Sequence, residues 1–269
     1  GGAGVLDFRV FTKFYFEGGS FMDILDYQLI LEKGDIRKLS GDLDEYFEKI
    51  QLELPSKESY GGFISFFENM ELEYSIREFN NRKCSLVINY ALAKKYLDKG
   101  IPDAPYYKVP GKNGTGISYF PLFEDEHYAN HYWYGFYMES FYFRFEGLLD
   151  AIYHILKQKY DLNIPTKNGF QQAVLKKVKI KEPDLYNFLK SFKENNAYID
   201  MKKIRNDITH NYSPNQLSSG ITRHKNGDGK TEAISSGVPE YTNVSQIQSN
   251  VDSNIRLLAE LIEDIQKYL

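Results

Sequence analysis

The chain has 269 residues, of which 42% are hydrophobic and 26% charged, and its formal net charge is −4. This composition allows a buried core and excludes a chain that is disordered throughout, and the single cysteine excludes an intrachain disulfide and a zinc site made of cysteines alone. No apolar run approaches the roughly 18 residues that a transmembrane helix needs, and no secretory signal is visible. We therefore expect a cytoplasmic protein without membrane association.

The N-terminal part of the sequence alternates short apolar runs with breaks. Residues 5–16 fit the period of either a strand or a helix, and both alternatives stay open. Residues 101–122 carry several Pro and Gly residues and are predicted to form a connecting loop. Apolar residues at helical spacing, with Gly and Pro as stop signals, predict helices over 22–33, 41–52 and 62–99.

After this loop the helical pattern becomes more regular. It predicts helices over 126–160, 168–178, 183–194, 196–212 and 244–268. The polar stretch 213–243 contains ITRHK-NGDG-KTEAI, which is typical of a β-hairpin with a Gly-rich turn. The fold is therefore predicted to be mainly all-α, an elongated antiparallel helical bundle with one minor hairpin.

The charge is unevenly distributed along the chain. Residues 157–230 hold 15 Lys and Arg against 7 Asp and Glu, a balance of +8, whereas the remainder has a balance of −12. A basic block inside an acidic protein is typical of a surface that binds a polyanion. A solvated helix face beside a loop would give the same count, so the charge alone does not decide between the two.

One short run in this block combines residue types that suit phosphodiester cleavage. It reads Arg205-Asn206-Asp207-Ile208-Thr209-His210-Asn211-Tyr212, the pattern R-N-x-x-x-H-x-Y. A neutral His can take a proton from a ribose 2′-OH or give one to the leaving 5′-oxygen, while an Arg holds the phosphate and an Asn orients either group. This chemistry needs no metal ion, and a 2′-OH nucleophile restricts the substrate to RNA.

The octet resembles the R-x4-6-H signature of the HEPN superfamily, whose members are helical bundles found in bacterial toxins and antiviral systems. It also resembles the R-x4-H-x-Y form of HEPN toxins encoded beside a nucleotidyltransferase antitoxin. The resemblance implies a metal-independent endoribonuclease without a cofactor, in a toxin–antitoxin or antiphage defence role. Arg205, His210 and Asn206 would be its catalytic residues, and the product would be a 2′,3′-cyclic phosphate.

The same resemblance implies partners and a domain organisation. Two copies of the motif would meet in a homodimer to form one cleft, and a nucleotidyltransferase-type antitoxin would modify Tyr212 with AMP. The HEPN-like bundle is expected over 126–269. Residues 1–125 are expected to be an N-terminal helical elaboration of unknown role, either separate from the bundle or continuous with it.

The spacing of the motif raises a geometric question. On a regular helix, Arg205 and His210 are about 140° apart, so one helix would not aim both at one phosphate. Thr209 is β-branched, and Pro214 disfavours a helical conformation of the residue before it. We therefore expect the helix to loosen over 209–213, which would turn the side chain of His210 towards that of Arg205. A two-fold axis could supply the rest, by placing one Arg and one His from each chain around a shared cleft.

Acidic residues of the predicted helix 126–160 are candidates for supporting this pair. Glu146 and Asp150 share a helix face, being four residues apart. These two residues either pair with neighbouring surface charges, or one of them is a buried acid that orients Arg205 or His210. The sequence alone does not place them near the motif.

Other residues support alternative functions. Arg223, His224 and Lys225 on the predicted hairpin are candidates for gripping the RNA backbone, or else form an exposed polar tip. A HEPN-like module could also bind RNA or a nucleotide without cutting it. A metal-dependent hydrolase could use His127 and His131, at i and i+4, although no third ligand is identifiable and a polar helix start explains the pattern as well.

Overall fold

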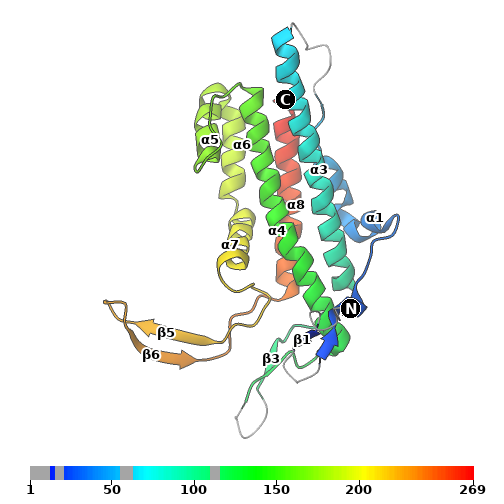
Figure 1. The fold of residues 1–269 in the computed structure, drawn as a ribbon, viewed down its shortest axis with the longest axis vertical. Coiled ribbons are helices and arrows are strands. Elements are labelled where there is room, and N and C mark those ends of the chain that lie inside the picture. Colours follow the sequence, from blue (N-terminus) through cyan, green and yellow to red (C-terminus); the bar gives the residue numbers. More distant parts are fainter. Residues whose placement is uncertain (1–12, 16–20, 55–62, 110–115) are drawn as a thin grey trace, which may run out of the picture.

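The computed structural model describes residues 13–15, 21–54, 63–109 and 116–269. Within these ranges the chain forms an elongated bundle of helices with three small antiparallel strand pairs (Figure 1). The predicted fold class, mainly all-α, is confirmed. None of the described helices combines the length and the apolarity that crossing a membrane requires.

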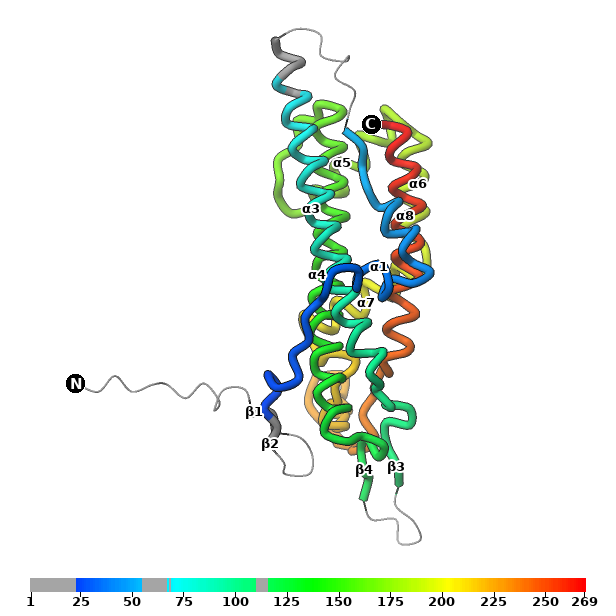
Figure 2. Tube along the Cα trace, turned by 90° about the vertical axis from the view of Figure 1, so that its right-hand side faces the viewer, coloured from blue at the N-terminus to red at the C-terminus, as the bar shows by residue number. Residues whose placement is uncertain are grey.

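Three long helices run along the molecule and form the bundle. They are α3 (Phe63–Lys99), α4 (Asp125–Lys159) and α8 (Val244–Gln266), and they lie side by side in two perpendicular views (Figures 1 and 2). α3 ends at Gly100, whose φ of 109° is a conformation that favours glycine. α8 begins with a capping box, in which the side chain of Asn243 accepts the N–H of Gln246. All three helices were predicted from their apolar periodicity.

Aromatic side chains fill the space between these helices. Tyr96 of α3 stacks on Trp133 of α4 with ring centroids 6.1 Å apart. A buried phenol needs a hydrogen-bond partner, and Tyr134 donates to the carbonyl of Val244 at the start of α8. The high aromatic content of the sequence thus serves helix packing.

A second row of shorter helices covers α4 (Figure 1). It consists of α5 (Phe170–Lys181), α6 (Pro183–Glu194) and α7 (Asn196–His210). Pro183 occupies the first turn of α6, where its missing N–H is not needed. Asn195 caps α7 by accepting the N–H of Ala197 at 2.9 Å. The C-terminal end of α7 then leads towards the largest hairpin.

The N-terminal segment packs across the bundle and differs from its prediction. Its elements are β1 (Lys13–Tyr15), β2 (Phe21–Asp23), a 3₁₀ turn (Ile24–Tyr27), α1 (Asp35–Ser40), a 3₁₀ turn (Gly41–Leu43) and α2 (Asp44–Lys49). α1 and α2 lie against α3 and α8 (Figure 2). The helix predicted over 22–33 is wrong, because side chains of α3 take its backbone groups: Tyr96 Oη accepts the N–H of Leu29, and Lys95 Nζ donates to the carbonyl of Ile30.

The predicted helix over 41–52 is likewise only partly present, as a 3₁₀ turn followed by the six-residue α2. The residues of 5–16 that precede β1 lie outside the described residues, so the choice between strand and helix is settled only for 13–15, which form a strand. The loop predicted over 101–122 contains the short pair β3 (Tyr107–Lys108) and β4 (Ser118–Tyr119).

The predicted hairpin is confirmed as β5 (Ile221–Lys225) and β6 (Thr231–Ser236), and it projects away from the helices (Figure 1). All residues of both strands are exposed. Its base is narrow, because Gly237 donates its N–H to the carbonyl of Gly220 at 2.9 Å. Gly220 has a φ of 62° and no room for a Cβ next to Gly237.

Candidate functional site

The arginine and the histidine of the octet both lie on the last turns of α7. Tyr198 and Met201 are buried and hold the helix against the bundle. The helical hydrogen bonds continue to the end of the element, where Asn211 donates its N–H to the carbonyl of Asp207 at 2.8 Å. Asn211 itself has left the helical conformation, with φ −128° and ψ −144°. The helix is thus two residues shorter than predicted, but it includes His210.

Arg205 is half-buried and turns towards α4. Its guanidinium carbon lies 5.8 Å from the centroid of the Phe143 ring, a cation–π contact. Nη1 donates to Oδ1 of the neighbouring Asn206 at 3.2 Å. Nε is buried and has no hydrogen-bond partner in the part of the chain that the structure describes. A half-buried guanidinium with an unused donor is suited to holding an anion.

Glu146 of α4 supplies the acid behind this arginine. One of its oxygens accepts a hydrogen bond from the Tyr198 hydroxyl of α7 at 3.2 Å. Burial raises the pKa of Glu146, while the nearby charges of Lys202 and Arg205 act in the opposite direction. The acid that the sequence could not place is half-buried and lies next to the motif, because α7 packs on α4. Asp150, one turn further on, instead accepts from Gln171 at 2.6 Å.

His210 is exposed at the end of the same helix. Because α7 stays helical through this residue, its side chain leaves the axis about 140° away from that of Arg205. The expected loosening that would bring His210 round is therefore wrong for this residue, since the helix breaks only after it. Thr209 stays within the helix, and its hydroxyl donates to the carbonyl of Arg205 at 2.8 Å. One chain alone presents the two residues on different faces.

Tyr212 follows the helix and is 65% exposed. It lines a groove of about 550 Å³ between the end of α7 and the chain returning from the hairpin. Asp207 and Asn211 of the octet line the same groove, together with Glu240. The groove therefore lies beside the motif, on a different face of α7 from the Phe143 contact.

The predicted hairpin residues point into solvent. Arg223 and Lys225 are exposed on β5, and His224 bonds through Nε2 to the Ser235 hydroxyl of β6 at 3.0 Å. A register shift follows His224. The hairpin projects from the helices, so these exposed side chains are accessible to a partner (Figure 1).

His127 and His131 have local partners. His127 Nδ1 accepts the N–H of Glu124 at 3.0 Å and completes the capping box of α4. His131 is half-buried, its Nε2 lies 3.0 Å from the Tyr241 hydroxyl, and desolvation by the packed side chains around it lowers its pKa to about 4. The described residues contain no group of three or more His, Cys, Asp and Glu side chains that could hold a metal ion.

The polar contacts of His131 fix the segment that carries the hairpin. Tyr241 donates to Asp103 at 2.6 Å, and Asp103 also accepts the N–H of Val244, at the start of α8. At the other end of the segment, buried Asn215 fits against Gly135 of α4, where an added Cβ would come within 2.8 Å of its Nδ2. The two ends of the segment are therefore held while the hairpin between them projects.

The octet thus lies at the end of a helix that packs on a mainly α-helical bundle. The family model described as HEPN_Cthe2314-like HEPN matches residues 75–269, and the chain belongs to this family. The match begins inside α3, before the domain boundary that the sequence predicts at 125/126, and that boundary stays a prediction. No curated protein and no solved structure matches the chain. HEPN membership indicates a ribonuclease or an RNA-binding module.

Proposed function

We propose that this protein is a metal-independent endoribonuclease that uses Arg205 and His210. The observation that carries the proposal is their setting on the last turns of α7. Arg205 is held against α4 with an unused donor, and His210 stands in solvent five residues later. Both lie inside a chain that belongs to a HEPN family.

The reaction follows from the chemistry of these groups. The 2′-oxygen attacks phosphorus, the bond from phosphorus to the 5′-oxygen breaks, and the products are a 2′,3′-cyclic phosphate and a 5′-hydroxyl. His210 takes the 2′-OH proton or protonates the leaving oxygen. Arg205 stabilises the charge that grows on the phosphoryl oxygens, and Asn206, 3.2 Å from Nη1, orients the guanidinium. Glu146 is a positioning residue that acts through Arg205.

The active species is a homodimer. Arg205 and His210 diverge by about 140° around α7, so one chain does not direct both at the same phosphate. A two-fold axis beside the helix end would bring Arg205 of one copy opposite His210 of the other. The site of each copy is incomplete without its partner.

The hairpin contacts RNA beyond the scissile bond. Arg223 and Lys225 are exposed cations on a projecting strand, and His224 lies between them. Cations on such an arm attract phosphates without regard to sequence. They add affinity, while the motif carries the chemistry.

The physiological role is growth arrest or antiphage defence. An enzyme of this kind needs a restraint in the healthy cell, and Tyr212 offers one. Its side chain is 65% exposed beside the motif, so a nucleotidyltransferase-type antitoxin could attach AMP to its hydroxyl. The added phosphate would place negative charge beside the RNA site.

The alternative function is an RNA-binding module that does not cut. Within one chain the side chains of Arg205 and His210 point in different directions from α7, so a monomer would be suited to binding RNA but not to cutting it. Arg205 would then hold a phosphate while His210 contributes only a hydrogen bond.

The test is cleavage of total RNA and transfer RNA in EDTA by the wild type and by His210→Ala. Cutting by the wild type alone, with a cyclic phosphate at the new 3′ ends, supports the enzyme. The matched control is Lys190→Ala, which removes a charge from an exposed position on α6 that lines neither cavity. If neither form cuts but both bind RNA equally, the protein is the binding module. Light scattering at micromolar concentration tests the dimer.

A further inference from the structure

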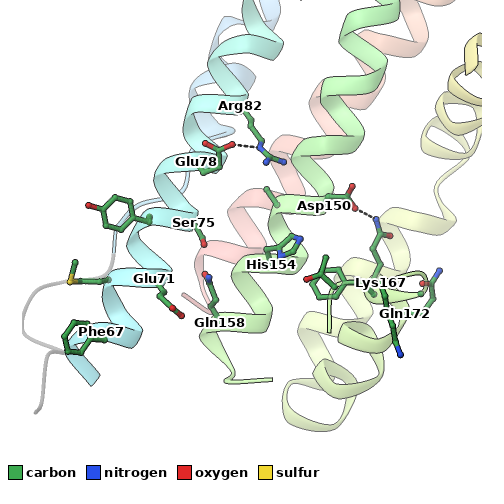
Figure 3. A pocket seen from close by; sticks show the side chains of 17 residues that line it. Phe67, Glu71, Ser75, Glu78, Arg82, Asp150, His154, Gln158, Lys167 and Gln172 are labelled. Carbon is green, nitrogen blue, oxygen red and sulfur yellow. Dashed lines mark hydrogen bonds and ion pairs between the residues drawn. The ribbon is translucent and has the colours of Figure 1, made fainter. Parts of the chain in front are cut away.

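A second cavity lies at the other end of the bundle from the hairpin. It has a volume of about 1110 Å³ and opens between α3, α4 and the start of α5 (Figure 3). Its walls include Glu71 and Ser75 from α3, His154 and Gln158 from α4, and Phe170 from α5. No residue of the motif octet lines it. It is a separate site that the ribonuclease chemistry does not use.

The inner wall of this cavity presents hydrogen-bond acceptors. Gln158 Oε1 is buried and has no hydrogen-bond partner among the described residues. A buried acceptor without a donor is unfavourable, so this oxygen favours a ligand that brings an N–H. His154 stacks on Phe170 at 4.6 Å, and burial lowers the pKa of its imidazole. A neutral imidazole does not repel a cation.

Five charged side chains line the cavity, Glu71, Glu78 and Asp150 against Arg82 and Lys167, and their balance of −1 favours a positive ligand. Arg82 is already satisfied, since Nε donates to Glu78 at 2.8 Å and Nη1 donates to the carbonyl of Gly147 at 3.0 Å. Asp150 receives one hydrogen bond, at Oδ1, from the neutral amide of Gln171. Glu71 contributes a second carboxylate that Arg82 does not neutralise. Figure 3 shows Glu71 near Gln158 and Asp150 further along α4.

The acceptors are separated along the helix axis. Asp150 and Gln158 are eight residues apart on α4, which is about 12 Å at the rise of an α-helix. Ala151, His154 and Phe170 also line the cavity and supply apolar and aromatic surface. The cavity therefore has two polar ends and an apolar middle. A single small ion could not occupy both ends.

We propose that this cavity binds a linear oligoamine, with one ammonium at Asp150 and another at Gln158 and Glu71. The methylene chain between them lies against His154 and Phe170. Ammonium groups are N–H donors that carry positive charge, which is what both ends lack. Aromatic faces next to the chain add cation–π attraction.

The experiment is calorimetric titration of the purified full chain with spermidine and, separately, putrescine. Spermidine is long enough to reach both ends, whereas putrescine is too short. We expect spermidine to bind at least about tenfold more tightly than putrescine. Asp150→Asn and Glu71→Gln should each weaken spermidine binding about tenfold. Both residues are exposed, so the variants should fold, and their melting temperatures without ligand check this.

The matched control is Glu260→Gln, which removes the same charge from an exposed position on α8. An equal loss of spermidine binding in all three variants would mean that only net charge matters, and no loss in any variant would mean that neither carboxylate of the cavity binds the amine. Either result would overturn the proposal. Equal affinity for the two amines, or no binding of spermidine at millimolar concentration, would also overturn it. RNA cleavage is not a readout here, so failure of this site leaves the ribonuclease proposal standing.

Discussion

Arg205 and His210 are five positions apart on one helix, yet their surroundings are opposite. Arg205 is half-buried, lies against Phe143 and is near half-buried Glu146 of α4. His210 stands in solvent at the point where α7 ends. The fold thus fixes the orientation of Arg205, the residue that would bind the phosphate. It leaves His210, the residue that would transfer the proton, accessible to a substrate or a second chain. Variants of His210, Arg205 and Glu146 test this contrast directly.

The largest expected effect is the loss of RNA cleavage in variants of His210 and Arg205, which should differ in how much stability they lose. His210→Ala should lower RNA cleavage by about 100-fold or more, because general acid–base catalysis contributes about that much. Its free energy of unfolding should stay within about 0.5 kcal/mol of wild type, since the side chain is exposed. Arg205→Ala should lose cleavage similarly and also lose about 1 kcal/mol of stability with its Phe143 contact. Rate assays and urea unfolding measure the two quantities, and equal unfolding free energies for both variants would contradict the contrast.

The next effect concerns the anchor of the hairpin segment. His131 has a pKa of about 4 when folded and about 6.5 when unfolded, so only the unfolded chain takes up this proton as the pH falls. Stability should therefore drop between pH 6.5 and 4, by about 3 kcal/mol from this group. The raised pKa of Asp103 acts in the opposite direction.

His131→Phe should make the free energy of unfolding less dependent on pH in this window than it is in the wild type. Urea unfolding at several pH values measures the slope. His224→Phe serves as the control, because that histidine is exposed on the hairpin. Parallel pH profiles for wild type and His131→Phe would rule out His131 as the acid-sensitive group.

A smaller effect is expected at Glu146. Glu146→Gln should slow cleavage about tenfold, because the arginine loses the charge that orients it. In the Arg205→Ala background the same change should have no further effect on rate. An additional tenfold loss there would mean that Glu146 acts independently of Arg205.

Stability should change in the opposite direction. The pKa of Glu146 is raised above its ordinary value of 4.5, so its ionised form destabilises the folded state at neutral pH. The Gln variant should be more stable than wild type at pH 7, and the difference should disappear below about pH 4.5. Thermal unfolding at both pH values measures this.

The smallest effect is expected on the hairpin. Arg223→Ala and Lys225→Ala should each weaken RNA binding a few-fold, equally for all sequences. Each should reduce the slope of log affinity against log salt by about 0.7, the value for one contact to a single strand. Lys33→Ala, an exposed residue far along the chain, should change neither. Unchanged slopes for the hairpin variants would remove the hairpin from the RNA interface.

Local signals in the sequence predicted most of the fold. The long helices α3, α4 and α8 follow from sustained apolar periodicity, and the β5–β6 hairpin follows from its NGDG turn. The helix predicted over 22–33 failed because Tyr96 and Lys95, more than 60 residues away, bind its backbone. Periodicity carries no information about such a competing partner.

The candidate site was predictable as a set of residues but not as an arrangement. The octet marked Arg205 and His210, and regular helical geometry already gave their angle. The expectation that the helix loosens before His210 was wrong, because α7 stays helical through His210. The side chain of His210 therefore does not turn towards Arg205. Glu146 could not be placed from sequence, because only the packing of α7 on α4 brings it to Arg205. Long-range helix packing is the physical information that the pattern lacks.

The narrow base of the hairpin has a consequence for how this chain could change. Gly220 and Gly237 are joined by a backbone hydrogen bond although 16 residues lie between them in the sequence. The chain could be rejoined at this point, and the bundle would keep every buried contact described above. Residues 221–236 are therefore a detachable accessory, and the turn at 226–229 is a natural position for a fusion partner or an insertion. Evolution could lengthen, replace or discard this arm without redesigning the helices that carry Arg205 and His210.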